Sequence, residues 1–408
     1  MSRDATQFAW ASPGAETLGW GASSRSSVIE IDAGALRHNV GVFRGLLASG
    51  CRLGAVVKAD AYGHGLLAVL PALHPEIDAL YVIAPGDALR VRAWEERTGA
   101  ARRDLLVLGV VGPEEAVALA RAGVAAVVGD PGWRAWVGPL REAGVTLAVH
   151  VHVDTGLGRE GFLPEEIAGG LEGIAAVADA VDVVGVLTHF ADTEDVTEQT
   201  YARRQLARFV DGERALAAVI GPRRLERHAA ASAPTLVLPE SRLDVVRVGV
   251  SIYGLWPSRE TRISARLVAG DLPDLRPVLS WRVHSQYVKE LPAGSYVGYG
   301  CTHRCRDATR VAVLPVGYHD GYPRALSNRA HVIVNGRRCP VLGRVMMNHL
   351  IVDVTGVPGL PDRVRATLLG RDGGEEVGAD DLAGWAGTIN YEIVARLPAH
   401  LPRVVVGG

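Results

Sequence analysis

The sequence predicts an α/β fold, a TIM barrel in the first part of the chain, followed by a mainly β domain. Between about residues 27 and 255, short apolar runs alternate with longer stretches rich in Ala, Leu, Arg and Glu. Apolar strands separated by helices indicate a parallel sheet covered on both faces, and about eight such units favour a closed barrel. After about residue 266, Pro and Gly become frequent and the helical periodicity fades. The 408 residues also exceed the size of one ordinary domain.

Seven apolar runs are the expected barrel strands, with helices between them. The runs are Gly54–Val57, Leu80–Ile83, Leu105–Leu108, Val124–Val128, Leu147–Val151, Val183–Leu187 and Val245–Val248. Two clear helical stretches cover Pro113–Ala122 and Thr197–Val219. An open doubly wound sheet is the alternative, but the G-x-G-x-x-G turn that commonly follows its first strand is absent from this sequence.

The second part of the chain has the texture of a β domain. Strands are expected over Ser280–Leu291, Arg310–Val316, His331–Val334 and Leu350–Val354, and a short helix near Leu382–Trp385. Asn335-Gly336 is a strong signal for a two-residue hairpin turn. The strand Val28–Ile31 could pair with either domain. We therefore expect a loose extension (1–26), a barrel domain (27–260) and a β domain (261–408).

Bulk composition fits an enzyme of the cytoplasm. The chain carries 43 basic and 45 acidic side chains, a formal net charge of −2, which gives no general attraction for nucleic acid or an anionic membrane. No uncharged apolar run reaches about 18 residues, so no transmembrane span is expected, and the first 25 residues lack the apolar block of a signal peptide. The four cysteines are expected to be reduced thiols. Cys301 and Cys305 have no second pair that would support a metal site, so no metal is predicted.

Lys58 is the first candidate for catalysis. It follows the apolar run Leu53–Val57 and opens the glycine-rich turn of Val57–Leu66, V-K-A-D-A-Y-G-H-G-L. A lysine at the mouth of a buried strand is poorly hydrated, so its pKa should fall and its amine should become available for Schiff-base chemistry. For an arbitrary Val-Lys pair, the alternative is a surface lysine after an edge strand.

Two further segments carry polar residues where ligands bind in barrels. Arg247 lies within the apolar run Val245–Val250, and an arginine is costly to bury without a partner, so it either has one or faces a ligand. Ser232, in the segment His228–Thr235, precedes an apolar turn. A serine in such a loop can bind phosphate together with backbone N–H groups, although serine also caps helices.

These segments, with six others, resemble the alanine racemases, a family of two-domain homodimers that use pyridoxal 5′-phosphate (PLP). The six are Val153–Gly161 (V-D-T-G-L-G-R-E-G), Leu187–Ala191 (L-T-H-F-A), Val297–Thr302 (V-G-Y-G-C-T), Pro315–Arg324 (P-V-G-Y-H-D-G-Y-P-R), Gly343–Asn348 (G-R-V-M-M-N) and Thr388–Ile393 (T-I-N-Y-E-I). The resemblance covers the chain from about Ser27 to its end.

The resemblance implies racemisation of L-alanine to D-alanine by two proton carriers on opposite faces of the substrate. Lys58 would act on one face, and Tyr299 of the partner subunit, from the second domain, on the other. Arg247 would donate to the ring nitrogen of PLP, which keeps that nitrogen unprotonated. The implied cofactor-binding residues are Lys58, Tyr62, His189, Ser232, Arg247, Gly249, Val250 and Tyr391. The implied substrate-binding residues are Arg159 and Met347.

Three positions depart from the family's pattern. Many members carry a carbamylated lysine where this chain has His152. Histidine cannot form that anionic group, so Arg159 needs another partner, a chloride or an acidic side chain. Ala231 replaces an asparagine near the cofactor, and Asn348 replaces an aspartate beside the substrate entrance. These changes alter the polarity of the pocket, so an amino acid other than alanine is an alternative substrate.

Two other functions are alternatives. A PLP-dependent amino-acid decarboxylase shares the two-domain architecture, but such enzymes use a cysteine in a Cys-Asp context, and no cysteine here precedes an aspartate. A non-catalytic PLP carrier would have no need of the domain that contains Tyr299. Exchange of the substrate α-hydrogen would separate a racemase from a carrier, and release of carbon dioxide would identify a decarboxylase.

Overall fold

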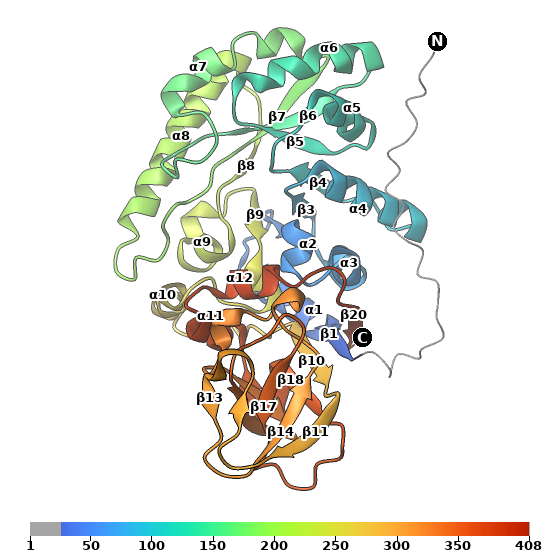
Figure 1. Ribbon diagram of the computed structural model, residues 1–408. Helices are drawn as coiled ribbons and strands as arrows, with labels where there is room; N and C mark the ends of the chain where they lie inside the picture. The colour runs from blue at the N-terminus through green and yellow to red at the C-terminus, as the bar shows by residue number, and fades with distance from the viewer. Residues whose placement is uncertain (1–25, 408) are drawn as a thin grey trace, which may run out of the picture.

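The computed structural model describes residues 26–407 and has the predicted architecture of a barrel followed by a mainly β domain (Figure 1). Eight parallel strands form one sheet in the order β8-β7-β6-β5-β4-β3-β2-β9. They are β2 (Arg52–Val56), β3 (Ala79–Val82), β4 (Asp104–Val107), β5 (Ala125–Val128), β6 (Leu147–His152), β7 (Val181–Leu187), β8 (Glu226–His228) and β9 (Val245–Val248). The expected loose extension lies outside the described residues, except for Ser26.

Two backbone hydrogen bonds join the edges of this sheet. Arg247 N donates to Ala230 O at 2.9 Å, and Asp244 N donates to Arg227 O at 3.1 Å, so β8 and β9 come together. The sheet is thereby a nearly closed barrel, and the open doubly wound alternative is wrong. In an open sheet the two edge strands lie apart and do not form hydrogen bonds with each other.

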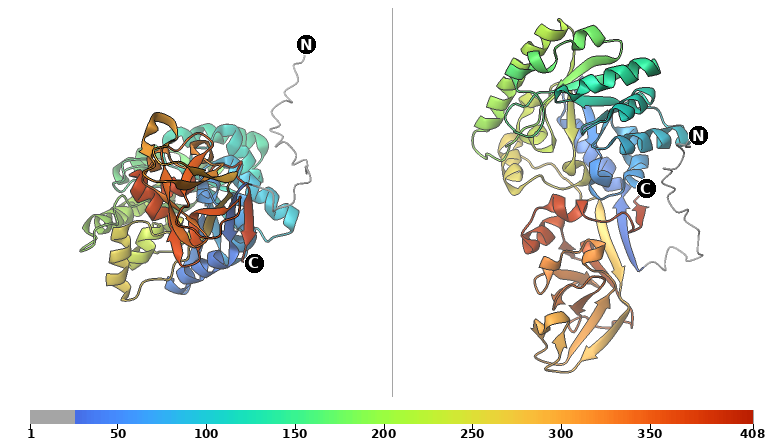
Figure 2. Two further views of the ribbon diagram at one scale, coloured as in Figure 1. Left: turned by 60° about the horizontal axis from the view of Figure 1, so that its bottom comes forward. Right: turned by 45° about the horizontal axis from the view of Figure 1, so that its top comes forward.

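Helices surround the barrel strands (Figures 1 and 2). They are α1 (Ala33–Leu46), α2 (Lys58–Tyr62), α3 (Leu66–Leu73), α4 (Pro85–Thr98), α5 (Pro113–Arg121), α6 (Arg134–Ala143), α7 (Ile167–Gly170), α8 (Thr200–Ile220), α9 (Ser232–Val237) and α10 (Arg259–Ala269). Their ends follow local chemistry. Asp32 caps α1 by accepting a hydrogen bond from Ala35 N at 2.9 Å. Pro85 is suited to the first turn of α4, because a backbone N–H at that position would have no partner within the helix and proline has none to satisfy.

The second sheet has ten strands and includes the first strand of the chain. Its order is β11-β14-β17-β16-β15-β18-β10-β1-β20, with β19 paired to β18. The strands are β1 (Ser27–Asp32), β10 (Leu279–His284), β11 (Tyr287–Leu291), β14 (Thr309–Leu314), β15 (His331–Val334), β16 (Arg337–Leu342), β17 (Leu350–Asp353), β18 (Arg365–Asp372), β19 (Glu375–Val377) and β20 (Arg403–Val406). Strand β1 is antiparallel to β10 and parallel to β20, which settles its pairing in favour of the second sheet.

Of two elements predicted in this part of the chain, one hairpin turn is confirmed and one strand is divided in two. The Asn335-Gly336 hairpin is confirmed, because Val334 pairs with Arg337 and both turn residues have positive φ, 48° and 70°. The expected strand over residues 280–291 is instead two strands, since β10 pairs with β18 while β11 pairs with β14. Ser285 marks the crossing: its backbone N donates to Val364 O at 2.8 Å, and its Oγ accepts from Val364 N at 2.9 Å.

The remaining elements complete the second domain. Helices α11 (Ala379–Ala386) and α12 (Asn390–Ala395) lie between the barrel and the second sheet (Figure 1). A small two-stranded sheet, β12 (Tyr296–Val297) and β13 (His303–Arg304), flanks the short η8 turn (Tyr299–Cys301). All four cysteines are free. Over residues 26–407, no helix combines the length and apolarity needed to cross a bilayer.

Candidate active site

A cavity of about 900 Å³ lies at the carboxyl ends of the barrel strands, the usual place for active sites in this fold. Nine of the eleven predicted site residues line it: Lys58, Tyr62, Arg159, His189, Ser232, Arg247, Gly249, Val250 and Tyr391. Residues of α11 and α12 form another part of the wall. The fold therefore brings together segments from all along the barrel and from the end of the chain.

Lys58 opens an unusual turn. Lys58 begins α2 two residues after Val56, the last residue of β2, and both residues line the cavity. The next four residues, Ala59 to Tyr62, all have φ between 52° and 56°, the left-handed region. This conformation costs about 1–2 kcal/mol for each residue other than glycine. The surrounding structure must therefore stabilise the turn.

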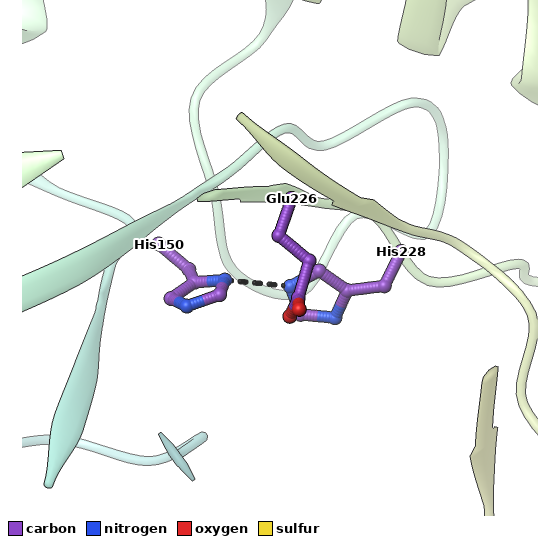
Figure 3. A group of neighbouring side chains, drawn as sticks. All are labelled: His150, Glu226 and His228. Atoms are coloured by element: carbon purple, nitrogen blue, oxygen red, sulfur yellow. Dashed lines mark hydrogen bonds between the residues drawn. The ribbon is translucent and has the colours of Figure 1, made fainter. Parts of the chain in front are cut away.

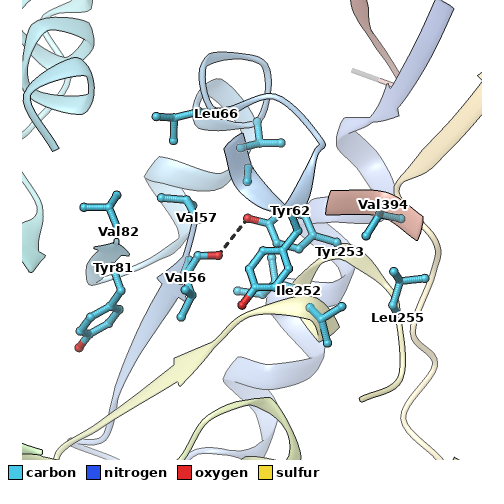
Figure 4. Packing of buried hydrophobic residues seen from close by; sticks show 14 of the residues in the cluster. Val56, Val57, Tyr62, Leu66, Tyr81, Val82, Ile252, Tyr253, Leu255 and Val394 are labelled. Atoms are coloured by element: carbon cyan, nitrogen blue, oxygen red, sulfur yellow. Dashed lines mark hydrogen bonds between the residues drawn. The ribbon is translucent and has the colours of Figure 1, made fainter. Parts of the chain in front are cut away.

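Specific contacts hold this turn (Figure 4). Tyr253 Oη donates to Val56 O at 3.1 Å, and its ring lies 5.5 Å from that of Tyr62. Asp60 Oδ1 accepts from Leu66 N at 2.8 Å. Gly63 lies directly against α12, where a Cβ would be only 1.8 Å from a backbone oxygen, so a side chain cannot fit. The turn that carries Lys58 is thus fixed by the barrel and by the end of the chain.

The charge of Lys58 is disfavoured in this cavity. Burial is the largest cause that lowers its pKa, and the nearby guanidinium groups of Arg159 and Arg247 lower it further, while Glu160 opposes them. A lowered pKa increases the fraction of the neutral amine, which is the nucleophilic and basic form. The sequence-based expectation for the Lys58 amine agrees with this direction.

Both terminal nitrogens of the Arg247 guanidinium, Nη1 and Nη2, form hydrogen bonds with protein groups. Its Nη1 donates to His228 O at 2.8 Å and to His228 Nδ1 at 3.0 Å. Its Nη2 donates to Thr188 O at 2.6 Å and approaches His189 Nδ1 at 3.5 Å. Among the described residues, no group accepts a hydrogen bond from Nε. The guanidinium is therefore anchored by protein groups at both Nη atoms, while Arg247 also lines the cavity.

Ser232 and Gly249 form a small polar corner beside Tyr62. Gly249 N donates to Ser232 Oγ at 2.9 Å, which orients the hydroxyl and leaves its own hydrogen free to donate. A Cβ on Gly249 would be 2.4 Å from Tyr62 Oη, so glycine allows the phenol to approach the backbone. A hydroxyl, a phenol and backbone N–H groups in one corner are suited to an anion such as phosphate.

Arg159 has an acidic partner at the cavity wall. Its Nη2 donates to Glu160 Oε1 at 2.8 Å, and both residues line the cavity. His152 is buried, and burial together with the charges of Arg247 and Arg159 lowers its pKa to about 3, so its ring is neutral. The sequence identified the missing lysine at this position but did not single out Glu160. Only the fold reveals that the next side chain along the chain turns back to Arg159.

The two phenols in the cavity are held in their protonated form. Burial raises the pKa of Tyr62, and burial together with the charge of Glu194 raises the pKa of Tyr391 to about 12.

The other two predicted site residues lie outside the cavity. Tyr299 and Met347 do not line the cavity and are 72% and 55% exposed, respectively, on the second domain.

Comparisons with known proteins agree with this arrangement. The family profiles for the N-terminal and C-terminal domains of alanine racemase match residues 31–257 and 278–405. Alanine racemase from Symbiobacterium thermophilum is 40% identical over 393 residues, 94% of this chain and 98% of that protein. Alanine racemase from Leptospira interrogans serogroup Icterohaemorrhagiae serovar copenhageni is 36% identical over 391 residues, 93% and 96% of the two chains. The structure of alanine racemase from Bacillus anthracis with bound L-Ala-P has a TM-score of 0.83 at 30% identity, covering 94% and 96%.

Fold, cavity and relatives together define the class of the protein. It is an amino-acid racemase, an enzyme with an N-terminal barrel and a C-terminal β domain. The chain belongs to the alanine racemase family, and enzymes of that family depend on PLP. The resemblance seen in the motifs is thereby confirmed over nearly the whole chain.

Proposed function

We propose that this protein interconverts L-alanine and D-alanine as a PLP-dependent homodimer in the cytoplasm, with the chain divided into its two domains near residue 260. Lys58 exchanges a proton on one face of the substrate, and Tyr299 of the partner subunit does so on the other. The observation that carries the proposal is the convergence of nine predicted site residues, Lys58 among them, in one cavity. Its relatives of matching length are alanine racemases.

The residues of the cavity fit the cofactor. Lys58 would carry it, and the polar corner of Ser232, Gly249, Val250 and Tyr62 would hold its phosphate. The close approach of Tyr62 Oη to Gly249, which any Cβ would prevent, supports this cradle. When bound, PLP acidifies the α-hydrogen of an amino acid by delocalising the charge that its loss leaves behind.

Arg247 and His189 would flank the ring of the cofactor. Arg247 would donate one hydrogen bond through Nε, the guanidinium nitrogen that has no acceptor among the described residues. Burial lowers the pKa of Arg247 to about 10, so it stays charged and cannot accept a proton at neutral pH. It would therefore leave the ring nitrogen unprotonated and limit how far charge is drawn into the ring.

Arg159 would bind the carboxylate of the substrate. Its guanidinium has five N–H donors, and the bond to Glu160 Oε1 uses one of them. A charge-assisted contact to the substrate carboxylate would fix the orientation of the α-carbon between the two proton carriers. Met347, exposed on the second domain, would contact the substrate from the partner subunit, and Tyr391, which lines the cavity, would bind the cofactor.

We place the second proton carrier outside this barrel. Burial and the nearby arginines lower the pKa of His189 to about 3, so its neutral ring is a weak base. Tyr62 and Tyr391 are held protonated by their raised pKa values. Efficient proton transfer needs a group that can both give and take a proton near the working pH. Tyr299, exposed on the second domain, is free to enter the cavity of a second copy of the chain.

Mixed dimers test this proposal. Chains with Lys58→Ala and chains with Tyr299→Phe are each expected to be nearly inactive, since each site would lack one carrier. After mixing and refolding, half of the dimers should contain one chain of each kind, and each of these should have one intact site. We expect about one quarter of the activity of the unaltered protein. If mixing restores no activity although mixed dimers form, Tyr299 does not act across subunits.

The identity of the substrate can be tested directly. The protein is incubated with each L-amino acid in D₂O. The enantiomers of the product are separated by chiral chromatography, and their deuterium content is measured by mass spectrometry. Alanine should exchange and racemise fastest. Faster racemisation of another amino acid would assign a different substrate, and release of carbon dioxide would indicate a decarboxylase.

A further inference from the structure

A hydrogen-bond chain leads from Arg247 through two buried histidines, His228 and His150, toward the amino ends of the barrel strands. Figure 3 shows the two histidines. His150 on β6 and His228 on β8 point toward one another, and His150 Nδ1 lies 2.8 Å from His228 Nε2. On its other side, His228 Nδ1 lies 3.0 Å from Arg247 Nη1. His228 is completely buried and His150 is 7% exposed. Both contacts are therefore shielded from water.

The hydrogen bond from Arg247 determines which ring nitrogen carries the hydrogen in His228 and in His150. A guanidinium only donates hydrogen bonds, so His228 Nδ1 must be an acceptor without a hydrogen. Burial and the charge of Arg247 lower the pKa of both histidines, to about 4 for His150, so both rings are neutral. The single hydrogen of His228 then lies on Nε2 and is donated to His150 Nδ1. It follows that the hydrogen of His150 lies on Nε2.

These hydrogen positions also argue against a metal ion bound between His150, Glu226 and His228. His150, Glu226 and His228 each offer a ligand atom, and these atoms lie within 4.8 Å of one another. However, His228 Nε2 carries a hydrogen as long as its Nδ1 accepts from Arg247, so it has no lone pair for a cation. The carboxylate of Glu226 also forms a salt bridge with Arg52, which satisfies its charge.

We propose that His150 is a positioning residue that aligns Arg247 through His228. This inference rests on the proposed function, in which Arg247 donates to the ring nitrogen of the cofactor. By accepting the Nε2 hydrogen, His150 keeps His228 in the one neutral form whose Nδ1 can accept from Arg247. Hydrogen bonds in such a chain also polarise one another, which strengthens the hold on the guanidinium.

The neighbouring strand leaves space for the His150 ring of this hydrogen-bond chain. A Cβ at Gly185, on the neighbouring strand β7, would be 2.1 Å from His150 Nδ1, so glycine is needed beside the ring. His150 and Glu226 also line a second cavity of about 370 Å³ toward the amino ends of the strands. A cavity of this size, with polar side chains such as Glu226 in its wall, can hold water, and a water there would be an acceptor for the Nε2 hydrogen of His150.

Two substitutions separate positioning from mere packing. In His150→Gln, the amide oxygen can still accept from His228 Nε2. In His150→Leu, that hydrogen has no acceptor, and His228 is free to move the hydrogen to Nδ1, where it repels Arg247. We expect His150→Leu to lower kcat roughly 10- to 100-fold with little change in KM. His150→Gln should keep most of the activity.

His74→Leu is the matched control. His74 is also a buried histidine, paired with Glu95 at 2.8 Å, but it does not line either cavity. Its loss should lower the melting temperature as His150→Leu does. It should leave kcat and the visible absorbance of the bound cofactor unchanged, whereas His150→Leu should shift that absorbance. Equal effects of the two variants on the absorbance and on kcat would show that His150 only packs.

The hydrogen positions can be measured independently of activity. In protein labelled with ¹⁵N-histidine, the ring nitrogens of His228 and His150 should each show a protonated Nε2 and an unprotonated Nδ1 at neutral pH. An Nδ1 hydrogen on His228 would overturn the inference. So would one equivalent of Zn²⁺ bound by the holoenzyme and lost in His150→Gln. If the protein binds no PLP but has these tautomers, the proposed function fails and the hydrogen-bond chain remains.

Discussion

Arg159 forms its ion pair with the residue that follows it, Glu160, and both line the cavity that contains Lys58. The Nη2 to Oε1 distance is 2.8 Å. His152, at the position of the family's carbamylated lysine, carries a neutral ring and supplies no negative charge. Of the two partners that the sequence left open for Arg159, a chloride and an acidic side chain, the structure provides the acidic side chain.

Glu160→Gln should raise KM for the amino acid about two- to fivefold and change kcat less. The effect is modest because both side chains are partly exposed, and exposed ion pairs contribute about 0.2–1 kcal/mol. The loss of the carboxylate also removes the charge that raises the pKa of Lys58, so the acidic limb of the pH profile should move to lower pH. Steady-state kinetics over a range of pH values measure both effects.

Glu165→Gln is the control for this variant, since Glu165 pairs with Arg208 at 3.5 Å and lies outside the cavity. It should leave KM unchanged. Bicarbonate should have no effect on the unaltered protein, because no carbamate is needed. A requirement for bicarbonate, or an unchanged KM in Glu160→Gln, would contradict the role given to Glu160.

Much of this site could be predicted from the sequence because many of its residues lie at or just beyond the carboxyl ends of the barrel strands: Lys58 follows β2, His189 follows β7, and Arg247 lies in β9. Residues two apart on a strand face the same side, so the pattern His150-Val151-His152 already indicates two histidines on one face of β6. The Asn335-Gly336 hairpin is equally local, because both residues tolerate positive φ.

The rest depends on contacts between distant segments. No glycine occupies positions 59–62, so nothing in the sequence indicated that these four residues adopt the left-handed conformation. That turn is imposed by Tyr253 and by α12, which are far away in the chain. The pairing of β1 with β20 and the connection from Arg247 to His150 likewise become visible only in three dimensions.

Lys58→Ala should abolish covalent retention of the cofactor. In the unaltered protein, borohydride should fix PLP irreversibly to the chain, and mass spectrometry should find the added mass on the peptide that contains Lys58. The variant should bind PLP only reversibly, and racemisation should fall by at least roughly 10²–10⁴-fold, the range for loss of one acid–base group. Cofactor fixed to another lysine in the unaltered protein would refute the assignment.

Gly249→Ala should weaken PLP binding more than it weakens the fold. The new methyl would meet Tyr62 Oη at 2.4 Å, so the phenol would have to leave the polar corner that we assign to the phosphate. Gly138→Ala is the matched control, because nothing lies within 4 Å of a Cβ at that position. Equilibrium dialysis should find a PLP dissociation constant raised about tenfold or more in Gly249→Ala alone, which corresponds to at least 1.4 kcal/mol. Equal PLP affinity in both variants would remove Gly249 from the phosphate site.

The free energy of unfolding should fall steeply as the pH drops below about 6.5, the ordinary pKa of histidine. Five histidines have lowered pKa values in the folded chain, mainly because desolvation disfavours their charged form: His64 and His150 to about 4, His152 and His189 to about 3, and His228 well below its usual range. Between pH 6.5 and these values the unfolded chain binds more protons than the folded chain, so stability is lost as the pH falls.

Each of these histidines adds about 1 kcal/mol per pH unit to that slope. Above about pH 6.5 they are neutral in both states and add nothing. Urea unfolding at a fixed protein concentration, from pH 7.5 to pH 4.5, measures the slope. His150→Gln removes one of the five titrating groups and should reduce the slope by about 1 kcal/mol per pH unit. A free energy of unfolding that stays constant from pH 6.5 to pH 4.5 would mean that these rings are charged in the folded protein, which would also remove the basis for the tautomers assigned to His228 and His150.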